Sequence, residues 1–345
     1  MQDLAFPFGE TPPDEGGVRI AEGVFWLPFP LPFPPGHINL WALEDGDGWT
    51  LVDAGFSTGA NRARWERHFA GTLGGRPVTR ILLTHQHPDH VGLAAWLAQR
   101  FGAPVFMTAG EWDLLQALHA LPDDETTAVF TALHRRHGLD AERTQAFAGA
   151  GNGYRRAIPA LPAAVQTISD GETIRIGGRD WTVIVGGGHT PDHAGLHCAE
   201  AGLYIAGDQV LPRISSNIGV WPVAPEADPL SDYLRSLDDH RRLPADTLVL
   251  PSHGAPFHGL HLRLDALRTH YARRLAIIEE ECAAGPRTAA DLLPLLFRQP
   301  LDPQSVMFAM AEAIGYVHHL AGRGRLEAVE DGDGQIAFAL SRRLG

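Results

Sequence analysis

Apolar runs of strand length alternate with helix-forming stretches along the chain up to about residue 258. The segments 62–71 and 91–100 are rich in helix formers and predict two helices. Turn residues at 45–48 separate two alternating runs and predict a β-hairpin over residues 38–53. Further apolar runs predict strands at residues 80–83, 103–107, 173–176, 181–185 and 203–208, and a last run from residue 247 leads to His253.

Two other regions are helical in pattern. Between about residues 110 and 161, Trp112, Leu115 and Leu118 recur at helical spacing and predict an inserted group of helices. This insertion would form a lid over a site or a surface for packing or dimerisation, and the sequence leaves both interpretations open. Two of its histidines, His134 and His137, are expected to face solvent.

The segment after residue 258 changes character. A long amphipathic helix is predicted at 260–278, and it is followed by helices at 288–297 and 303–321 and by a hairpin at 326–340. We therefore predict a loose leader at 1–22, which is rich in proline, glycine and acidic residues, a main domain at 23–258 and a small domain at 259–345.

Proline dominates residues 24–35. Because proline removes a backbone donor, we expect only the first few of these residues to form a strand, before the chain opens into an extended aromatic loop. Phe29 and Phe33 on that loop would wall a substrate mouth, together with His37, or would simply pack on the domain.

The densest chemistry lies in the seven residues 84–90, Thr-His-Gln-His-Pro-Asp-His, which join a predicted strand to a predicted helix. On such a turn His85 and His87 can point to one side while Asp89 and His90 point to another, so one loop could serve two metal ions. Imidazole and carboxylate ligands suit zinc, iron or manganese. The alternative is a histidine-rich surface loop.

This His85-x-His87-x-Asp89-His90 pattern resembles the signature of the metallo-β-lactamase superfamily. The resemblance implies an α/β (α+β) fold, an αββα sandwich, here with a helical insertion at about 110–161 and a small winged-helix-like C-terminal domain. The other motifs of the family follow in order along the chain: Asp53-Ala54-Gly55, Gly188-His189-Thr190-Pro191, Asp208 and His253.

The resemblance also implies roles for these residues. The first metal would be held by His85, His87 and His189, and the second by Asp89, His90 and His253, with Asp208 bridging the two. Asp89 and Asp208 are also the expected catalytic residues. Asp53 and His193 would orient the metal-binding loops without binding metal. Asp192 stands where many relatives have glycine and would place a carboxylate near the rim of the mouth.

Charge and composition narrow the choice of partners. The net charge is −13 and all 28 basic residues are arginine, which disfavours nucleic acid. The predicted helix at 303–320 has no arginine or lysine, so a role in packing or homodimer formation is preferred for the C-terminal domain. Two cysteines cannot build a disulfide framework, and no apolar run is long enough to span a membrane. Since no signal-peptide pattern is seen either, a cytoplasmic location is expected.

We therefore interpret the chain as an enzyme, a hydrolase with two divalent metal ions, zinc being preferred and iron or manganese possible alternatives. A metal-bridging hydroxide would cleave a small-molecule ester, thioester or lactone. A phosphodiesterase or endoribonuclease with the same dinuclear site is the first alternative. A metal-stabilised binding protein without catalysis is the second.

Overall fold

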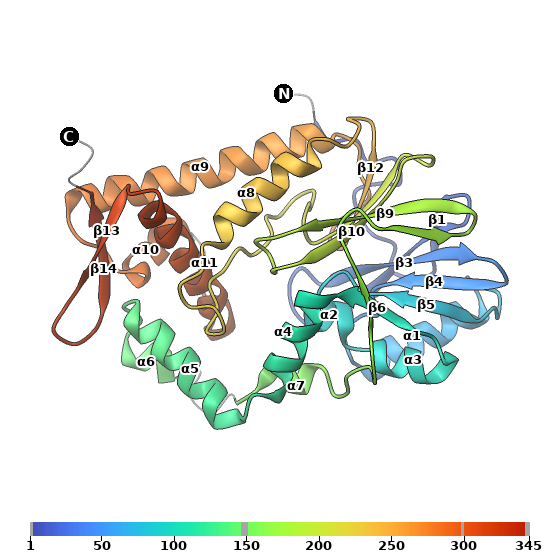
Figure 1. Ribbon diagram of the computed structural model, residues 1–345, viewed down its shortest axis with the longest axis horizontal. Helices are drawn as coiled ribbons and strands as arrows, with labels where there is room; N and C mark the ends of the chain where they lie inside the picture. Colours follow the sequence, from blue (N-terminus) through green and yellow to red (C-terminus); the bar gives the residue numbers. More distant parts are fainter. Residues whose placement is uncertain (1–2, 146–150, 298–299, 342–345) are drawn as a thin grey trace.

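Two β-sheets packed face to face, with helices on both outer sides, form the body of the molecule (Figure 1). The structure is a computed structural model that describes residues 3–145, 151–297 and 300–341. The expected αββα sandwich is thereby confirmed. Within the described residues, no helix combines the length and the apolar composition that crossing a membrane requires.

The first sheet has seven strands in sequential order. The strands β1 to β4 are antiparallel, and β4 to β7 are parallel. Their bounds are Val18–Ala21 (β1), Val24–Pro30 (β2), His37–Asp45 (β3), Gly48–Val52 (β4), Val78–Leu82 (β5), Val105–Thr108 (β6) and Gln166–Ile168 (β7). The predicted hairpin over residues 38–53 is therefore confirmed as β3 and β4.

The second sheet has five strands in the order β12-β11-β10-β9-β8. Only β11 and β12 run parallel to each other. The bounds are Thr173–Ile176 (β8), Arg179–Gly186 (β9), His193–Cys198 (β10), Leu203–Gly207 (β11) and Leu248–Pro251 (β12).

Three apolar clusters hold the layers together. Trp26, Trp41 and Ile205 belong to the cluster between the sheets. The helices α1 (Gly59–Ala70), α2 (Pro88–Val91) and α3 (Ala94–Phe101) follow strands of the first sheet, and Trp65 and Leu97 bury the apolar face of this layer. On the outer side of the second sheet, α8 (Pro229–His240) packs with the C-terminal helices.

The insertion and the C-terminal segment complete the helical shell. The insertion supplies α4 (Ala109–Ala120), α5 (Asp123–Arg136), α6 (Ala141–Gln145) and α7 (Gly153–Ala157). The C-terminal segment has α9 (Leu260–Ala284), α10 (Ala289–Leu296), α11 (Pro303–Gly322) and the hairpin of β13 (Leu326–Glu330) and β14 (Ile336–Leu340). Three helices and a hairpin thus occur in the expected order, while the winged-helix comparison stays a prediction.

The prediction for the proline-rich stretch was right for residues 31–35, which form a loop, and wrong for residues 28–30. Strand β2 continues to Pro30, and both Pro28 and Pro30 remain in register with β3. Because the pairing of β1 with β2 ends at Trp26, the prolines occupy a part of β2 that has a neighbouring strand on one side only. Such an edge is where a sheet tolerates the missing N–H group of proline.

The leader and the two insertion histidines also differ from expectation. Residues 1–22 are not loose throughout, because they contribute β1 and a bridge between Ala5 and His258. His134 and His137 do not face solvent, since each is only 1% exposed. The reason is that α5 packs against the C-terminal segment, where Ala290 donates a backbone hydrogen bond to the carbonyl of His137 at 3.1 Å.

Candidate metal centre

The predicted ligands all follow the carboxyl ends of strands. Residues 84–90 come after β5, His189 after β9, Asp208 after β11 and His253 after β12. Since β4 and β5 are parallel neighbours in one sheet, and β11 and β12 in the other, the loops after them meet at one edge of the sandwich. The fold therefore brings together side chains that lie up to 168 positions apart.

A first group consists of His85, His87, His189 and Asp208, whose ligand atoms all lie within 4.8 Å of one another. His85 Nε2 is 3.0 Å from His87 Nδ1 and 3.3 Å from His189 Nε2. His189 Nε2 is 3.4 Å from Asp208 Oδ2. Three nitrogens and one carboxylate oxygen therefore face a common point.

A second group consists of Asp89, His90 and His253. Their ligand atoms also lie within 4.8 Å of one another, and His253 Nε2 is 3.5 Å from Asp89 Oδ2. The other oxygen of Asp208, Oδ1, is 3.6 Å from His90 Nε2 and 3.5 Å from His253 Nε2. Asp208 thus presents one oxygen to each group, which is the geometry that a bridging carboxylate needs.

The donor atoms fit divalent cations. His90 Nε2 and Asp208 Oδ1 are buried and have no hydrogen-bond partner among the described residues. Burial of polar groups without a partner is costly, and a cation between them would remove that cost. Imidazole nitrogen with carboxylate oxygen is the donor set that zinc, iron and manganese accept. The two groups can therefore hold one metal ion each, with Asp208 shared.

Hydrogen bonds on the far side of three rings fix which nitrogen is free for a metal. His90 Nδ1 donates to Asp53 Oδ2 at 2.7 Å. His189 Nδ1 donates to the carbonyl of Asn217 at 2.9 Å, and His253 Nδ1 donates to the carbonyl of His37 at 2.8 Å. Each bond leaves Nε2 directed at the centre, as in metal sites whose ligands are oriented by outer partners.

Asp53 holds the loop after β5 in place. Its Oδ1 accepts from the backbone N–H of Thr84 at 2.8 Å, and its Oδ2 accepts from the Thr84 hydroxyl at 2.9 Å and from His90. Asp53 has a φ of 64°, the left-handed region that side chains other than glycine seldom adopt. The strain is of order 1 kcal/mol and is compensated by this network of buried bonds.

Electrostatics at the two groups differ. Burial, with smaller contributions from neighbouring imidazoles, lowers the pKa of His85 and His87 well below 6.5, so both are neutral and able to bind a cation. Burial alone would also lower the pKa of His90, but the Asp53, Asp89 and Asp208 carboxylates raise it well above the ordinary value. The second group therefore carries surplus negative charge that attracts a cation.

His193 supports Asp208 from behind. Its Nε2 accepts a hydrogen bond from the backbone N–H of Asp208 at 3.1 Å, and the ring is fully buried. A Cβ at Gly207 would lie 2.3 Å from that nitrogen, so the close approach requires glycine at this position.

Glu111, which sequence reasoning missed, ties two of the metal loops together. It lies in the first turn of α4 and is 0% exposed. Its carboxylate accepts from the backbone N–H of Gln86 at 2.9 Å and from that of Asp192 at 3.0 Å. Tyr154 of α7 adds a third tie by donating its hydroxyl to the carbonyl of Gln86 at 2.7 Å. A single acidic residue in a helical turn gives no sequence signal of such a role.

The residues predicted to line a substrate mouth occupy different kinds of position in the structure. Phe29 does not line one, because it is 1% exposed and packs against Trp65 with ring centroids 4.8 Å apart. Phe33 is partly exposed and meets Phe56 edge to face. Asp192 is half-buried beside α4.

His37, the remaining residue predicted at the mouth, instead holds the loop that carries the ligand His253. Its carbonyl holds His253, and its Nε2 accepts from the backbone N–H of Gly254 at 2.9 Å. The pKa of His37 is lowered by burial and by His253, so the neutral ring can accept this bond.

Three partly exposed aromatic side chains from different segments meet near the loop that carries Asn217. Phe130 of α5 lies 6.2 Å from Trp221, and Trp221 lies 5.5 Å from Phe308 of α11, measured between ring centroids. Asn217, which orients His189, donates its side-chain amide to the carbonyl of Phe308 at 3.4 Å. The insertion, the loop after β11 and the C-terminal segment thus contribute to one aromatic group.

Comparison with known proteins gives a consistent result. Residues 33–253 match the model of the "Metallo-beta-lactamase superfamily", and residues 275–341 match that of the "Metallo-beta-lactamase-like, C-terminal domain". A β-lactamase domain protein from Burkholderia ambifaria is 40% identical, with a TM-score of 0.91 and 98% of each chain covered. A metallo-β-lactamase family protein from Thermus thermophilus is 30% identical, with a TM-score of 0.77, over 93% of this chain and 100% of that one.

Curated relatives extend the comparison. The probable metallo-hydrolase YqjP of Bacillus subtilis (strain 168) is 26% identical over 90% of this chain and 96% of its own length. An atrochrysone carboxyl ACP thioesterase of Aspergillus fumigatus is 26% identical over 76% of this chain and 49% of its own length.

Proposed function

The chain belongs to the metallo-β-lactamase superfamily and is a metallo-hydrolase of that family, and from this premise we propose that it cleaves the acyl bond of a small ester, thioester or lactone. The observation that carries the proposal is the position of Asp208 between two ligand groups, one on each carboxylate oxygen. An arrangement of this kind suits hydrolysis by two metal ions, without any nucleophile from the protein.

Two divalent ions, which we propose to be zinc in preference to iron or manganese, would lower the pKa of a bound water into the neutral range and polarise the acyl carbonyl. The chain itself supplies orientation and a route for the proton. Asp53, Asn217 and His37 fix the rings of the ligands His90, His189 and His253. Asp89 has a side chain 15% exposed against 9% for Asp208, so of the two carboxylates that of Asp89 is the more accessible base for the proton released in hydrolysis.

The proposed acyl specificity rests on the aromatic group of Phe130, Trp221 and Phe308. Partly exposed aromatic rings near a metal ligand favour an apolar acyl group over a charged one. The thioesterase of A. fumigatus, which is 26% identical over 76% of this chain, supports a thioester as one substrate class. A chain with a net charge of −13 disfavours a nucleic-acid substrate.

The test joins metal analysis with a substrate panel. The panel contains aryl esters, acyl thioesters, lactones, a phosphodiester and a β-lactam, each measured with the wild-type protein, with Asp208→Ala and with Asp246→Ala. Asp246 is an exposed aspartate that precedes β12, whereas the ligand His253 follows this strand, and it serves as the matched control. We expect about two metal ions per chain, acyl-bond cleavage, and a loss in Asp208→Ala larger than the roughly 10–100-fold typical of losing an outer partner of a ligand.

Three other outcomes would contradict the acyl hydrolase proposal. Preferred cleavage of the phosphodiester would replace the acyl hydrolase by a phosphodiesterase with the same centre. Two metals without cleavage of any substrate would favour a metal-stabilised binding protein. Full activity in Asp208→Ala would exclude the centre described here.

A further inference from the structure

The outward face of α9 is unusually apolar for an exposed helix. This helix runs along the rim of the molecule, from the neighbourhood of β12 to the C-terminal hairpin (Figure 1). Its exposed positions recur at helical spacing, and we define the outer face of α9 by Leu262, Ala266, Thr269, Ala272, Arg273, Ala276, Ile277 and Glu280. Two of these eight side chains are charged, and a third charged side chain on the same side of the helix, the exposed Asp265, pairs with Arg241.

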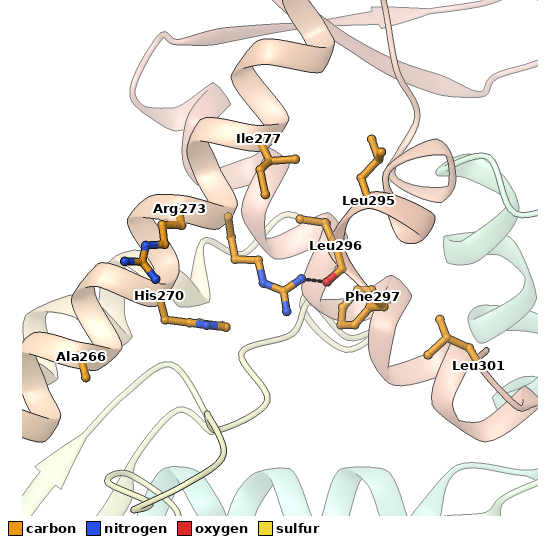
Figure 2. Close-up of a pocket in the computed structure, with 9 residues that line it drawn as sticks. Ala266, His270, Arg273, Ile277, Leu295, Leu296, Phe297 and Leu301 are labelled. Atoms are coloured by element: carbon orange, nitrogen blue, oxygen red, sulfur yellow. Dashed lines mark hydrogen bonds between the residues drawn. The ribbon is translucent and has the colours of Figure 1, made fainter. Parts of the chain in front are cut away.

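Exposed large apolar side chains concentrate around this face. Nine such side chains occur among the described residues, and four of them lie on or beside α9: Ile214, Leu262, Ile277 and Leu295. Figure 2 shows Ile277 on α9 and Leu295 near the end of α10 on two sides of a cavity of about 540 Å³. Apolar groups gathered in this way mark a surface that a partner covers.

The charges of α9 provide a second, independent observation. Six of its eight arginine, aspartate and glutamate side chains have partners within the chain: Arg263 and Arg274 bind backbone carbonyls, and Asp265, Arg268, Glu279 and Glu281 form ion pairs. Over the described part of the chain, no ion pair or hydrogen bond involves the side chain of Arg273 or Glu280. The two have opposite charge and both belong to the outer face.

The spacing of Arg273 and Glu280 along α9 determines how a second copy of the helix could pair with it. Arg273 and Glu280 are seven residues apart, which is two helical turns or about 10.5 Å along one side of the helix. Ala276 and Ile277 lie between them. If a second copy of this helix lies antiparallel with its midpoint between Ala276 and Ile277, each Arg273 faces the partner's Glu280.

We propose that the chain forms a two-fold symmetric homodimer through the outer face of α9, paired antiparallel about Ala276 and Ile277. A two-fold interface uses the same patch on both copies, so a patch with one cation and one anion placed evenly about its centre is complementary to itself. A uniformly basic or acidic partner would be attracted by one of these charges and repelled by the other. The alanines at 272 and 276 allow close approach of the two helices.

The area that the two helices can bury limits the affinity of the proposed dimer. Pairing about Ala276 and Ile277 brings residues 269–284 of the two helices together, an overlap of about 24 Å, and a strip about 10 Å wide along it offers on the order of 240 Å² per copy. A standard stable interface buries about 800 Å² per partner, so this contact depends on the flanking Leu295 and has modest affinity. We expect dissociation constants in the micromolar range.

The test is a charge swap on the full chain, loaded with metal and followed by sedimentation velocity from about 1 to 200 μM. The wild-type protein is expected to dimerise over this range, and Arg273→Glu and Glu280→Arg are each expected to weaken the dimer at least about 10-fold. The double variant Arg273→Glu/Glu280→Arg restores the pairing, and so does an equimolar mixture of the two single variants. Arg67→Glu, on an exposed position of α1, is the control that leaves dimerisation unchanged.

Each remaining outcome overturns the proposal. A wild-type chain that stays monomeric at 200 μM has no such interface. Dimers that are insensitive to both single substitutions form elsewhere. If the single variants dissociate but neither the double variant nor the mixture recovers, the antiparallel register is wrong. Circular dichroism and metal content of every variant show that the fold is retained, so a misfolded variant is not counted as a monomer.

Discussion

Two regions of this molecule contain buried histidines, and only one of them brings carboxylates beside the rings. One is the metal centre at the strand ends. The other, which we term the helical junction, lies where the insertion and the C-terminal segment pack together and contains the buried His134 and His137 and the partly exposed His318. Burial alone therefore does not distinguish a functional polar cluster from a structural one.

The side chains that surround a buried titratable group determine whether it stays charged. At the metal centre, burial would raise the pKa of Asp208, but the imidazoles of His253 and His90 lower it well below the ordinary value, so the carboxylate stays charged. Glu312 of α11 has no such cluster of imidazoles, and burial raises its pKa to about 7, so the carboxyl takes a proton near neutrality. His137 faces the rings of His318 and Phe338 rather than carboxylates. Convergence of unlike ligand types, rather than burial, identifies the metal site.

The largest effect is expected from removing the charge of Asp53, which supports the metal centre. Replacing Asp53 by asparagine keeps the shape of the side chain but removes the negative charge that His90 and Thr84 share. We expect metal affinity to fall by roughly 10–100-fold, as for other outer partners of metal ligands. A competitive chelator titration measures the change, with His137→Phe as the control from the helical junction. Equal affinity in Asp53→Asn and wild type would contradict the role assigned to Asp53.

Acid should destabilise the fold through the helical junction. Burial, helped by His318 and Arg136, lowers the pKa of His137 from 6.5 to about 3, so between these values the unfolded chain binds a proton that the folded chain does not. Stability therefore falls as the pH drops through this window, by about 2 kcal/mol for this one group at pH 5. Denaturant unfolding at pH 7.5 and pH 5 should show that His137→Phe loses about 2 kcal/mol less than wild type. An equal loss in both proteins would show that His137 is not the group responsible.

A smaller effect of the opposite sign is expected from Glu312. Because its pKa is raised from 4.5 to about 7, the charged form is disfavoured in the folded state, and stability decreases as the pH rises between these values. Glu312→Gln removes this cost and should raise the free energy of unfolding by about 1 kcal/mol at pH 5.5, with little change at pH 4. Glu327→Gln on exposed β13 is the control. A gain of the same size at both pH values would assign the effect to packing instead of charge.

The metal centre could be predicted from the sequence for a physical reason. Four of its residues lie within six positions of one another on a single loop, and the others terminate strands whose apolar pattern is strong. Parallel strands then bring these ends to one edge without further information. The helical junction could not be predicted, because the neighbours of His137 are His318 and Phe338, 181 and 201 positions away on elements that carry no matching pattern.

The same reasoning explains the remaining misses. The continuation of β2 to Pro30 depends on the absence of a neighbouring strand on one side, a property of sheet order that local composition does not express. The role of Glu111 depends on two backbone N–H groups, those of Gln86 and Asp192, coming within reach of one carboxylate. Such contacts are defined only once the chain has folded.

The carboxylate of Glu111 also bears on how this architecture can be rearranged. Deleting the insertion from residue 110 to 161 would leave the N–H groups of Gln86 and Asp192 buried without their acceptor, at a cost of roughly 1–3 kcal/mol each. The insertion is therefore not an interchangeable module that can be exchanged between scaffolds as a unit. A graft that alters the helices beyond it must retain Glu111 and the turn that presents it, because the metal loops are built partly from the element that covers them.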